Sequence, residues 1–259
     1  MKTAIFAFLF LGLSVSMLAQ NDAGSSRITD KNGISWMTYV GTHRFAKQFE
    51  FYTELSLRRG DGLQKNQQTI LRLGGNWRPV PNLLFHLGYA NARFGNIGDY
   101  PEYPVNGGLK ENRVYEQVNY RTMIDFLEIQ HRFRLEQRWM QETPAYGKGN
   151  SPEGFYQNRA RYMFRLNCPI SGKTIDDGEF YVSAWDEFML NFGPNVESNF
   201  FDQNRLGLLV GYRFHKDFMI EAGYINQLLE QGTLVQNKPV YQINQGLITS
   251  ITYNFDFRD

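Results

Sequence analysis

Arginine and glutamate recur on one face of several alternating segments of this chain. Where the alternation is clear, that face carries eleven arginines and five acids: Arg58, Arg72, Arg78, Arg132, Arg134, Arg138, Arg159, Arg161, Arg165, Arg205 and Arg213, with Glu50, Glu54, Glu128, Glu136 and Glu221. The guanidinium group is planar, weakly hydrated and able to hold a carboxylate or phosphate through two parallel hydrogen bonds. Two kinds of chemistry follow: a ladder of ion pairs that fixes the structure, or a path that attracts anions.

Lysine has a different distribution from arginine. We expect all nine lysines outside strands, in the N-terminal region, turns or loops: Lys2, Lys31, Lys47, Lys65, Lys110, Lys148, Lys173, Lys216 and Lys238. The compact ammonium group needs full hydration, whereas guanidinium tolerates a partly dry surrounding. A face whose cations are all arginines therefore indicates a crowded interior, which we interpret as the lumen of a barrel. The arginines and acids named above, except Arg78, are the candidate lumen-lining residues.

The histidines do not point to a catalytic or metal site. A lipid hydrolase needs a nucleophilic serine beside a histidine base, and none of the four histidines has a serine within three positions. A pair across neighbouring strands, which lie ~4.8 Å apart, stays open. The histidines fall in four separate segments, and Cys168 is the only cysteine, so neither a metal cluster nor a disulfide framework is expected. No catalytic residue, metal or cofactor is predicted.

The elements that must position the arginine rows are β-strands. In residues 49–58, Phe49, Phe51, Leu55 and Leu57 alternate with polar side chains, and a period of two is the signature of a strand. Similar rows begin near residues 83, 127, 158, 206, 220 and 247. Eleven strands are clear, and we expect about twelve, the last lying within residues 21–33 or 95–112.

The connections between these segments alternate in length. Short turns are expected near residues 46–48, 78–82, 124–126 and 215–218, and long polar loops at 60–67, 95–112, 141–154, 193–202 and 230–241. Outer-membrane barrels show this alternation, with tight periplasmic turns and longer external loops. The sequence therefore predicts an all-β fold, a transmembrane up-and-down antiparallel β-barrel.

The N-terminal residues resemble an export signal. Lys2 precedes an apolar run over residues 3–13, and Ala19 fits a cleavage position. We expect a signal peptide at 1–19, a tail at 20–33 and the barrel at 34–259, in the outer membrane of a Gram-negative cell. The formal net charge of +1 disfavours a nucleic-acid partner, and the expected partners are outer-membrane lipids and, during biogenesis, the barrel-insertion machinery.

One strand carries a family resemblance. Residues 127–139, LEIQHRFRLEQRW, resemble a strand of the DUF2490-type family of uncharacterised outer-membrane barrels, with support from Trp36, from the polar face of residues 50–58 and from the ending at residues 253–257. The resemblance implies the fold and the compartment and brings no activity with it.

Three classes of function are compatible with these observations. The favoured one is a non-enzymatic barrel, either structural or a narrow passage for a small solute of unknown identity, with an Arg/Glu-lined lumen. The first alternative is a lipid-modifying barrel enzyme, similar to a phospholipase or deacylase. The second is a surface-binding barrel that acts through its external loops, such as residues 95–112.

Overall fold

The structure is a computed structural model that describes residues 26–101, 109–141, 154–196, 199–232 and 234–258. The expected signal peptide at 1–19 lies outside these residues. No helix in the described part of the chain is long and apolar enough to span a membrane.

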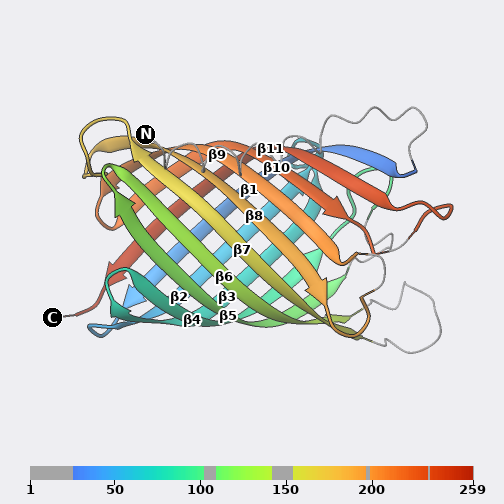
Figure 1. The fold of residues 1–259 in the computed structure, drawn as a ribbon, viewed down its shortest axis with the longest axis horizontal. Coiled ribbons are helices and arrows are strands. Elements are labelled where there is room, and N and C mark those ends of the chain that lie inside the picture. The colour runs from blue at the N-terminus through green and yellow to red at the C-terminus, as the bar shows by residue number, and fades with distance from the viewer. Residues whose placement is uncertain (1–25, 102–108, 142–153, 197–198, 233, 259) are drawn as a thin grey trace.

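Within the described residues, eleven strands close into a single barrel in which each strand pairs with its neighbours in sequence (Figure 1). The strands are β1 Ile28–Arg44, β2 Phe49–Gly60, β3 Lys65–Val80, β4 Leu83–Phe94, β5 Lys110–Ile124, β6 Leu127–Gln141, β7 Phe155–Pro169, β8 Glu179–Phe192, β9 Phe201–His215, β10 Phe218–Glu230 and β11 Val240–Asp256, with a short 3-10 helix at Asp61–Leu63. The all-β barrel fold expected from the alternation is confirmed.

The expected count of about twelve strands is wrong. Neither region suspected of hiding a further strand contains one among its described residues. In residues 21–33 the strand that begins at Ile28 is β1 itself, and in residues 95–112 strand structure begins only at Lys110, the start of β5. Antiparallel neighbours alternate in direction, so an odd number leaves the first and last strands parallel. β1 and β11 accordingly pair in parallel, from Ile28 opposite Val240 to Arg44 opposite Asp256.

The two faces of the wall differ in the way the alternation predicts. On β2, Leu55 is 42% exposed on the outer face, whereas Ser56 beside it is 1% exposed. The same holds around the barrel, where leucine, phenylalanine, tyrosine and tryptophan are exposed outside and charged or amide side chains are buried inside. This is the reverse of a soluble barrel, whose apolar residues face inward.

The expectation that every lysine lies outside strands is wrong at three positions. Lys31 lies within β1, and Lys65 and Lys110 are the first residues of β3 and β5. All three are exposed and lie at the long-loop end of the barrel. Alternation alone could not place these strand ends, because strands of this barrel extend into the hydrated rim, where an ammonium group keeps its water.

The loop after β4 folds back into the barrel, and we refer to its described residues, 95–101, as the mouth loop. Ile97 is buried in a cluster with Ile34, Trp36 and Ile225. The main-chain oxygen of Tyr100 accepts hydrogen bonds from Gln231 Nε2 at 2.5 Å and Gln242 Nε2 at 2.7 Å. These contacts make the mouth loop a stopper at the long-loop end.

Candidate functional site

The middle of the barrel interior is organised around Glu136 on β6. Its carboxylate accepts hydrogen bonds from Arg159 Nη2 at 2.6 Å and from Arg161 Nη1 at 2.7 Å, and both arginines lie on the adjacent strand β7. Arg134, on the same strand as Glu136, adds a longer contact at 3.5 Å. The register explains the arrangement, because Glu136 lies directly opposite Arg159 and Arg134 opposite Arg161.

A second carboxylate, Glu187 on β8, continues the contacts. It accepts hydrogen bonds from Arg161 Nη2 and Arg132 Nη2, each at 2.7 Å. Arg161 also donates its Nε to Glu187 at 3.0 Å, so its planar head joins Glu187 to Glu136. One guanidinium thus connects carboxylates on both neighbouring strands.

A third cluster lies toward the long loops. Glu111 on β5 accepts hydrogen bonds from Arg113 Nε and Arg138 Nε, each at 2.6 Å. Arg138 also donates to Asn191 Oδ1 at 3.2 Å, and Asn191 Nδ2 donates to Asp202 at 3.2 Å. The other oxygen of Asp202 accepts Arg159 Nη1 at 2.8 Å, which closes the connection back to Glu136.

These contacts form one continuous set that we call the ion-pair network: Glu111, Arg113, Arg132, Arg134, Glu136, Arg138, Arg159, Arg161, Glu187, Asn191 and Asp202. Its members come from five consecutive strands, β5 to β9, and all but Arg132 are buried. Buried charge is stable only when paired and hydrogen-bonded, and bidentate arginine contacts meet that requirement. The network can therefore fix strand register and fill the interior.

The charge balance of the interior corrects the sequence-based count. Among the described residues, eight arginines and eight carboxylates are buried: Arg58, Arg72, Arg113, Arg134, Arg138, Arg159, Arg161 and Arg205, with Asp30, Glu50, Glu54, Glu111, Glu136, Glu187, Asp202 and Glu221. Two things account for the difference from the count of eleven arginines and five acids: four of those arginines, Arg78, Arg132, Arg165 and Arg213, are only half-buried, and the strand pattern did not reveal four of the buried acids. The equal totals of buried charges weaken the argument for an anion path through the whole lumen.

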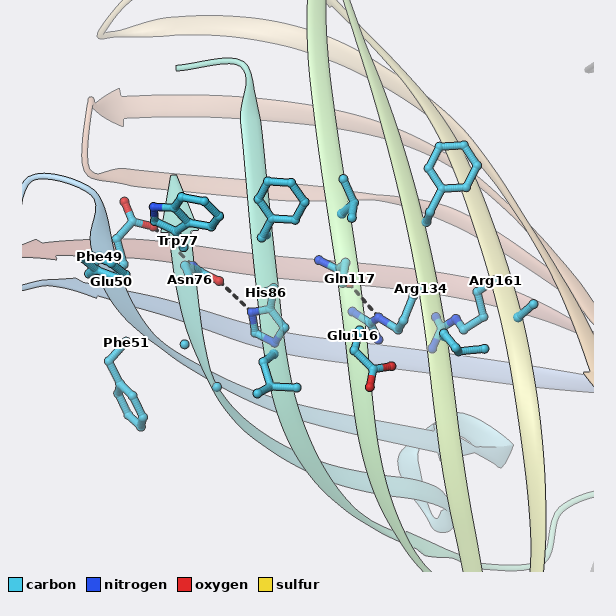
Figure 2. A pocket seen from close by; sticks show the side chains of 18 of the residues that line it. Phe49, Glu50, Phe51, Asn76, Trp77, His86, Glu116, Gln117, Arg134 and Arg161 are labelled. Atoms are coloured by element: carbon cyan, nitrogen blue, oxygen red, sulfur yellow. Dashed lines mark hydrogen bonds between the residues drawn. The ribbon is translucent and has the colours of Figure 1, made fainter. Parts of the chain in front are cut away.

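Several candidate residues lie inside the barrel but outside the network. Near the short turns, Glu50 accepts Arg44 at 2.7 Å, and Arg165 pairs with Glu221. Arg72 pairs with Glu54 on the adjacent strand. Figure 2 shows this part of the wall from close by, with Asn76 hydrogen-bonded to His86 and Gln117 to Arg134.

The remaining candidates have other partners. The candidate lumen-lining acid Glu128 accepts hydrogen bonds from Gln130 at 2.6 Å and Asn167 at 2.7 Å, with Arg121 farther away at 3.4 Å. Arg213 contacts Asp177 at 3.1 Å at the short-turn end. Arg58 and Arg205 lie toward the long loops, where Gln68 and Gln203 accept their hydrogen bonds.

Three acids of the network were missed from the sequence. Glu111 falls in a region interpreted as a loop, although it is the second residue of β5. Glu187 lies on β8, where outward Asp186 and inward Met189 break the apolar–polar alternation. Asp202 points inward because the β8–β9 register shifts near Met189, and a bulge of this kind re-aims a side chain.

The barrel has one hollow on its outer face and one cavity at its short-turn end. An outer hollow of about 940 Å³ lies against β2–β7, bordered by Phe51, Trp77 and Phe133, where Gly75 leaves open space. A cavity of about 540 Å³ opens at the short-turn end, lined by charged residues that include Arg165 and Glu221. The outer hollow is bordered mainly by apolar side chains, whereas most of the residues that line this cavity are polar or charged.

The described histidines contact hydroxyl, amide and aromatic groups. His131 lies on the outer face of β6, and its Nδ1 contacts Tyr162 Oη at 2.9 Å. His43 contacts Thr53 at 3.2 Å, and His86 contacts Asn76 and Tyr115. No serine hydroxyl bonds to a histidine ring, and no metal-binding group of His, Cys, Asp or Glu occurs, within the part of the chain that the structure describes.

A family comparison settles the relationship of the chain. Residues 33–238 match the family described as "Protein of unknown function (DUF2490)". The chain belongs to this family. Its resemblance at residues 127–139 is thereby confirmed, and those residues form most of β6, the strand that carries Arg134, Glu136 and Arg138 of the network.

Other comparisons add little. A solved structure described as "NanC porin structure in rhombohedral crystal form" is similar at 11% sequence identity and a TM-score of 0.46, over 82% of this chain and 89% of that one. A search among curated proteins found no match.

Proposed function

We propose that this DUF2490 member is a non-enzymatic outer-membrane barrel with a closed interior, a structural barrel that holds its external loops in place and forms no continuous passage. The observation that carries the proposal is the ion-pair network, which connects buried charges from β5 to β9. The mouth loop supports it by filling the long-loop end around Ile97 and Tyr100.

The outer face supports the membrane location. Exposed apolar side chains surround the barrel, including Leu55, Leu87 and Phe133 at 42%, 60% and 55% exposure. A soluble protein rarely exposes so much continuous apolar surface. The closed sheet pairs its backbone groups internally, as a lipid surrounding requires.

Aromatic rings gather toward both ends of this outer face. Phe180 lies 4.5 Å from Tyr212 and Tyr253 lies 4.4 Å from Phe255 at the short-turn end, measured between ring centroids. Trp139 and Tyr156, 5.3 Å apart, lie toward the long loops. Two aromatic girdles at the interfaces are typical of transmembrane barrels, and the short turns would then face the periplasm.

Two measurements test the proposal. The protein should fractionate with the outer membrane and migrate faster on gels before boiling than after it, because a closed sheet resists detergent unfolding. Purified barrel in a planar bilayer should give no steady current. Recovery as a soluble protein without a heat-modifiable band would contradict the membrane location, and a steady anion-selective current would replace the closed barrel with a narrow passage.

A further inference from the structure

The equal numbers of buried charges hide an uneven distribution. Glu50 and Glu221 form ion pairs with Arg44 and Arg165 near the short turns. Asp30, at the opposite end, accepts the main-chain N–H of Tyr100 at 3.3 Å and forms no ion pair with a described arginine. Arginines beneath the mouth loop are therefore in local excess over carboxylates.

Arg58 is the clearest member of that excess. It is 7% exposed, and among the described residues it forms no ion pair. Its Nη1 donates to the neutral Gln68 Oε1 at 2.8 Å, while its Nε is buried without a hydrogen-bond partner. A buried cation with neutral partners alone is energetically costly.

Arg205 approaches the same region from β9. Its Nε donates to Gln203 Oε1 at 2.8 Å, and its contact with Glu187 is long, at 3.8 Å, on a carboxylate that Arg132 and Arg161 already hold. Both Arg58 and Arg205 lie over the ring of Trp36, at 3.9 and 5.0 Å from its centroid. The ring quadrupole attracts both cations but neutralises neither.

A cavity of about 40 Å³ lies between these groups, bordered by Arg58, Arg205, Gln68 and Gln203 and by Ile97 of the mouth loop. One water molecule needs roughly 10–15 Å³ by the same kind of measure, so the space admits a few waters or one small anionic group. The two guanidinium groups of the lining favour a small anionic group.

Neutral amides hold the lining in place. Trp36 Nε1 donates to Gln67 at 2.7 Å, Gln67 donates to Gln227 at 3.0 Å, and Gln227 donates to Gln203 at 2.7 Å. This chain of hydrogen bonds occupies the amide oxygens that would otherwise repel an anion. The two guanidinium groups are thus fixed before any ligand arrives.

We propose that Arg58 and Arg205, with Trp36 between them, form a binding site for a small oxyanion group, a carboxylate or a phosphate, beneath the mouth loop. The anion would supply the charge and the acceptors that Arg58 lacks. This goes beyond the closed structural barrel, which needs no ligand.

The test uses the folded barrel in detergent. Sodium phosphate and, in a separate arm, sodium acetate are titrated at an ionic strength held constant with sodium chloride, and the thermal unfolding midpoint is measured. Because a ligand that binds only the folded state stabilises it, the midpoint should rise by roughly 5 °C at a hundredfold excess over Kd. A rise with phosphate alone, acetate alone or both supports the site and identifies the group that it takes.

Variants show whether the effect belongs to this site. Arg58→Gln should abolish the rise, whereas Arg121→Gln, which changes an exposed arginine at the opposite end, should keep it. Gln68→Glu places a carboxylate beside Arg58, so it should raise the anion-free midpoint and abolish the dependence on anions, and it decides the question if Arg58→Gln does not fold. No rise in the unmodified protein, or a rise that persists in Gln68→Glu, would overturn the proposal, whatever the bilayer recordings show.

Discussion

Two sides of the same barrel interior are stabilised in different ways. The side formed by β5 to β9 holds the ion-pair network, in which Arg159 and Arg161 contact their carboxylate partners at 2.6–2.8 Å. The side around β10, β11 and β1, which we call the amide side, is built from Gln227, Asn244, Gln242 and Asn32 beside the apolar Ile34, Trp36 and Ile225. Both sides are buried, and the amide side consists mainly of neutral groups, with Asp30 as a carboxylate that accepts a hydrogen bond from Gln242 at 3.3 Å.

The difference determines what a single substitution leaves behind. On the network side, removing one carboxylate leaves one or more guanidinium groups buried with fewer partners. On the amide side, removing one glutamine leaves neutral donors and acceptors. Because an uncompensated buried charge costs more than an unsatisfied neutral group, the same polar interior should respond unequally on its two sides.

The largest effect is expected for Glu136→Gln. The change removes the carboxylate that pairs with Arg159 and Arg161, and breaking such a buried pair costs about 3–5 kcal/mol. The urea midpoint of the barrel folded in micelles measures the loss. Glu116→Gln is the matched control, since Glu116 lies on the outer face of β5 and accepts a single hydrogen bond in the described structure, from Gln137 at 3.2 Å. Equal losses in the two variants would mean that the network does not stabilise the barrel.

A smaller loss is expected for Gln227→Leu on the amide side. It removes the hydrogen bonds with Gln67 at 3.0 Å, Gln203 at 2.7 Å and Asn244 at 3.2 Å. Groups left unsatisfied in this way cost about 1–3 kcal/mol, and no charge is left without its partner. The same urea titration should place this variant between Glu136→Gln and the unmodified protein. A loss larger than that of Glu136→Gln would reverse the proposed ranking of the two sides.

Asn226→Leu should act in the opposite direction. Asn226 lies on the outward row of β10, is 6% exposed, and its Nδ2 has no hydrogen-bond partner. Replacing it with leucine removes an unsatisfied buried donor, so we expect a gain of about 1 kcal/mol. A higher urea midpoint in lipid vesicles would show this gain, and a lower one would show that Asn226 has a polar role on the outer face.

The smallest effect is expected for Asp256→Asn. Asp256 pairs with Arg258 at 2.6 Å, as short a contact as those in the network, but both side chains are more than a third exposed. Water screens such a pair, and exposed pairs contribute little. The urea midpoint should not change measurably. A clear decrease would show that contact length, more than burial, controls the strength of these ion pairs.

The fold was largely predictable because alternation is a direct consequence of a wall with one polar and one apolar face. Leu55 and Ser56 were placed on the correct faces for this reason, and the pairing of β6 with β7 followed from their consecutive order. The strand number was less predictable, since closure by a parallel pair leaves no mark in the alternation of either strand.

The ion-pair partners were predictable only in part. Glu136 was identified because it lies in an unbroken row with Arg134 and Arg138. Asp202 could not be, because a bulge changes the face of a residue without changing the sequence pattern around it. Sequence alone therefore gave the arginines more accurately than the acids that neutralise them.

The parallel pairing of β1 with β11 has a consequence for the two ends of the wall. β1 starts at Ile28 beside Val240, at the long-loop rim, and β11 finishes at Asp256 beside Arg44, at the short-turn rim; Figure 1 shows the C-terminus at this second rim. In a barrel with an even number of strands, both ends emerge on the same side. Here, in the proposed orientation with the short turns toward the periplasm, a peptide tag placed just before Ile28 would be displayed to antibodies on intact cells, and a tag placed after Asp256 would be reached only after the cells are opened.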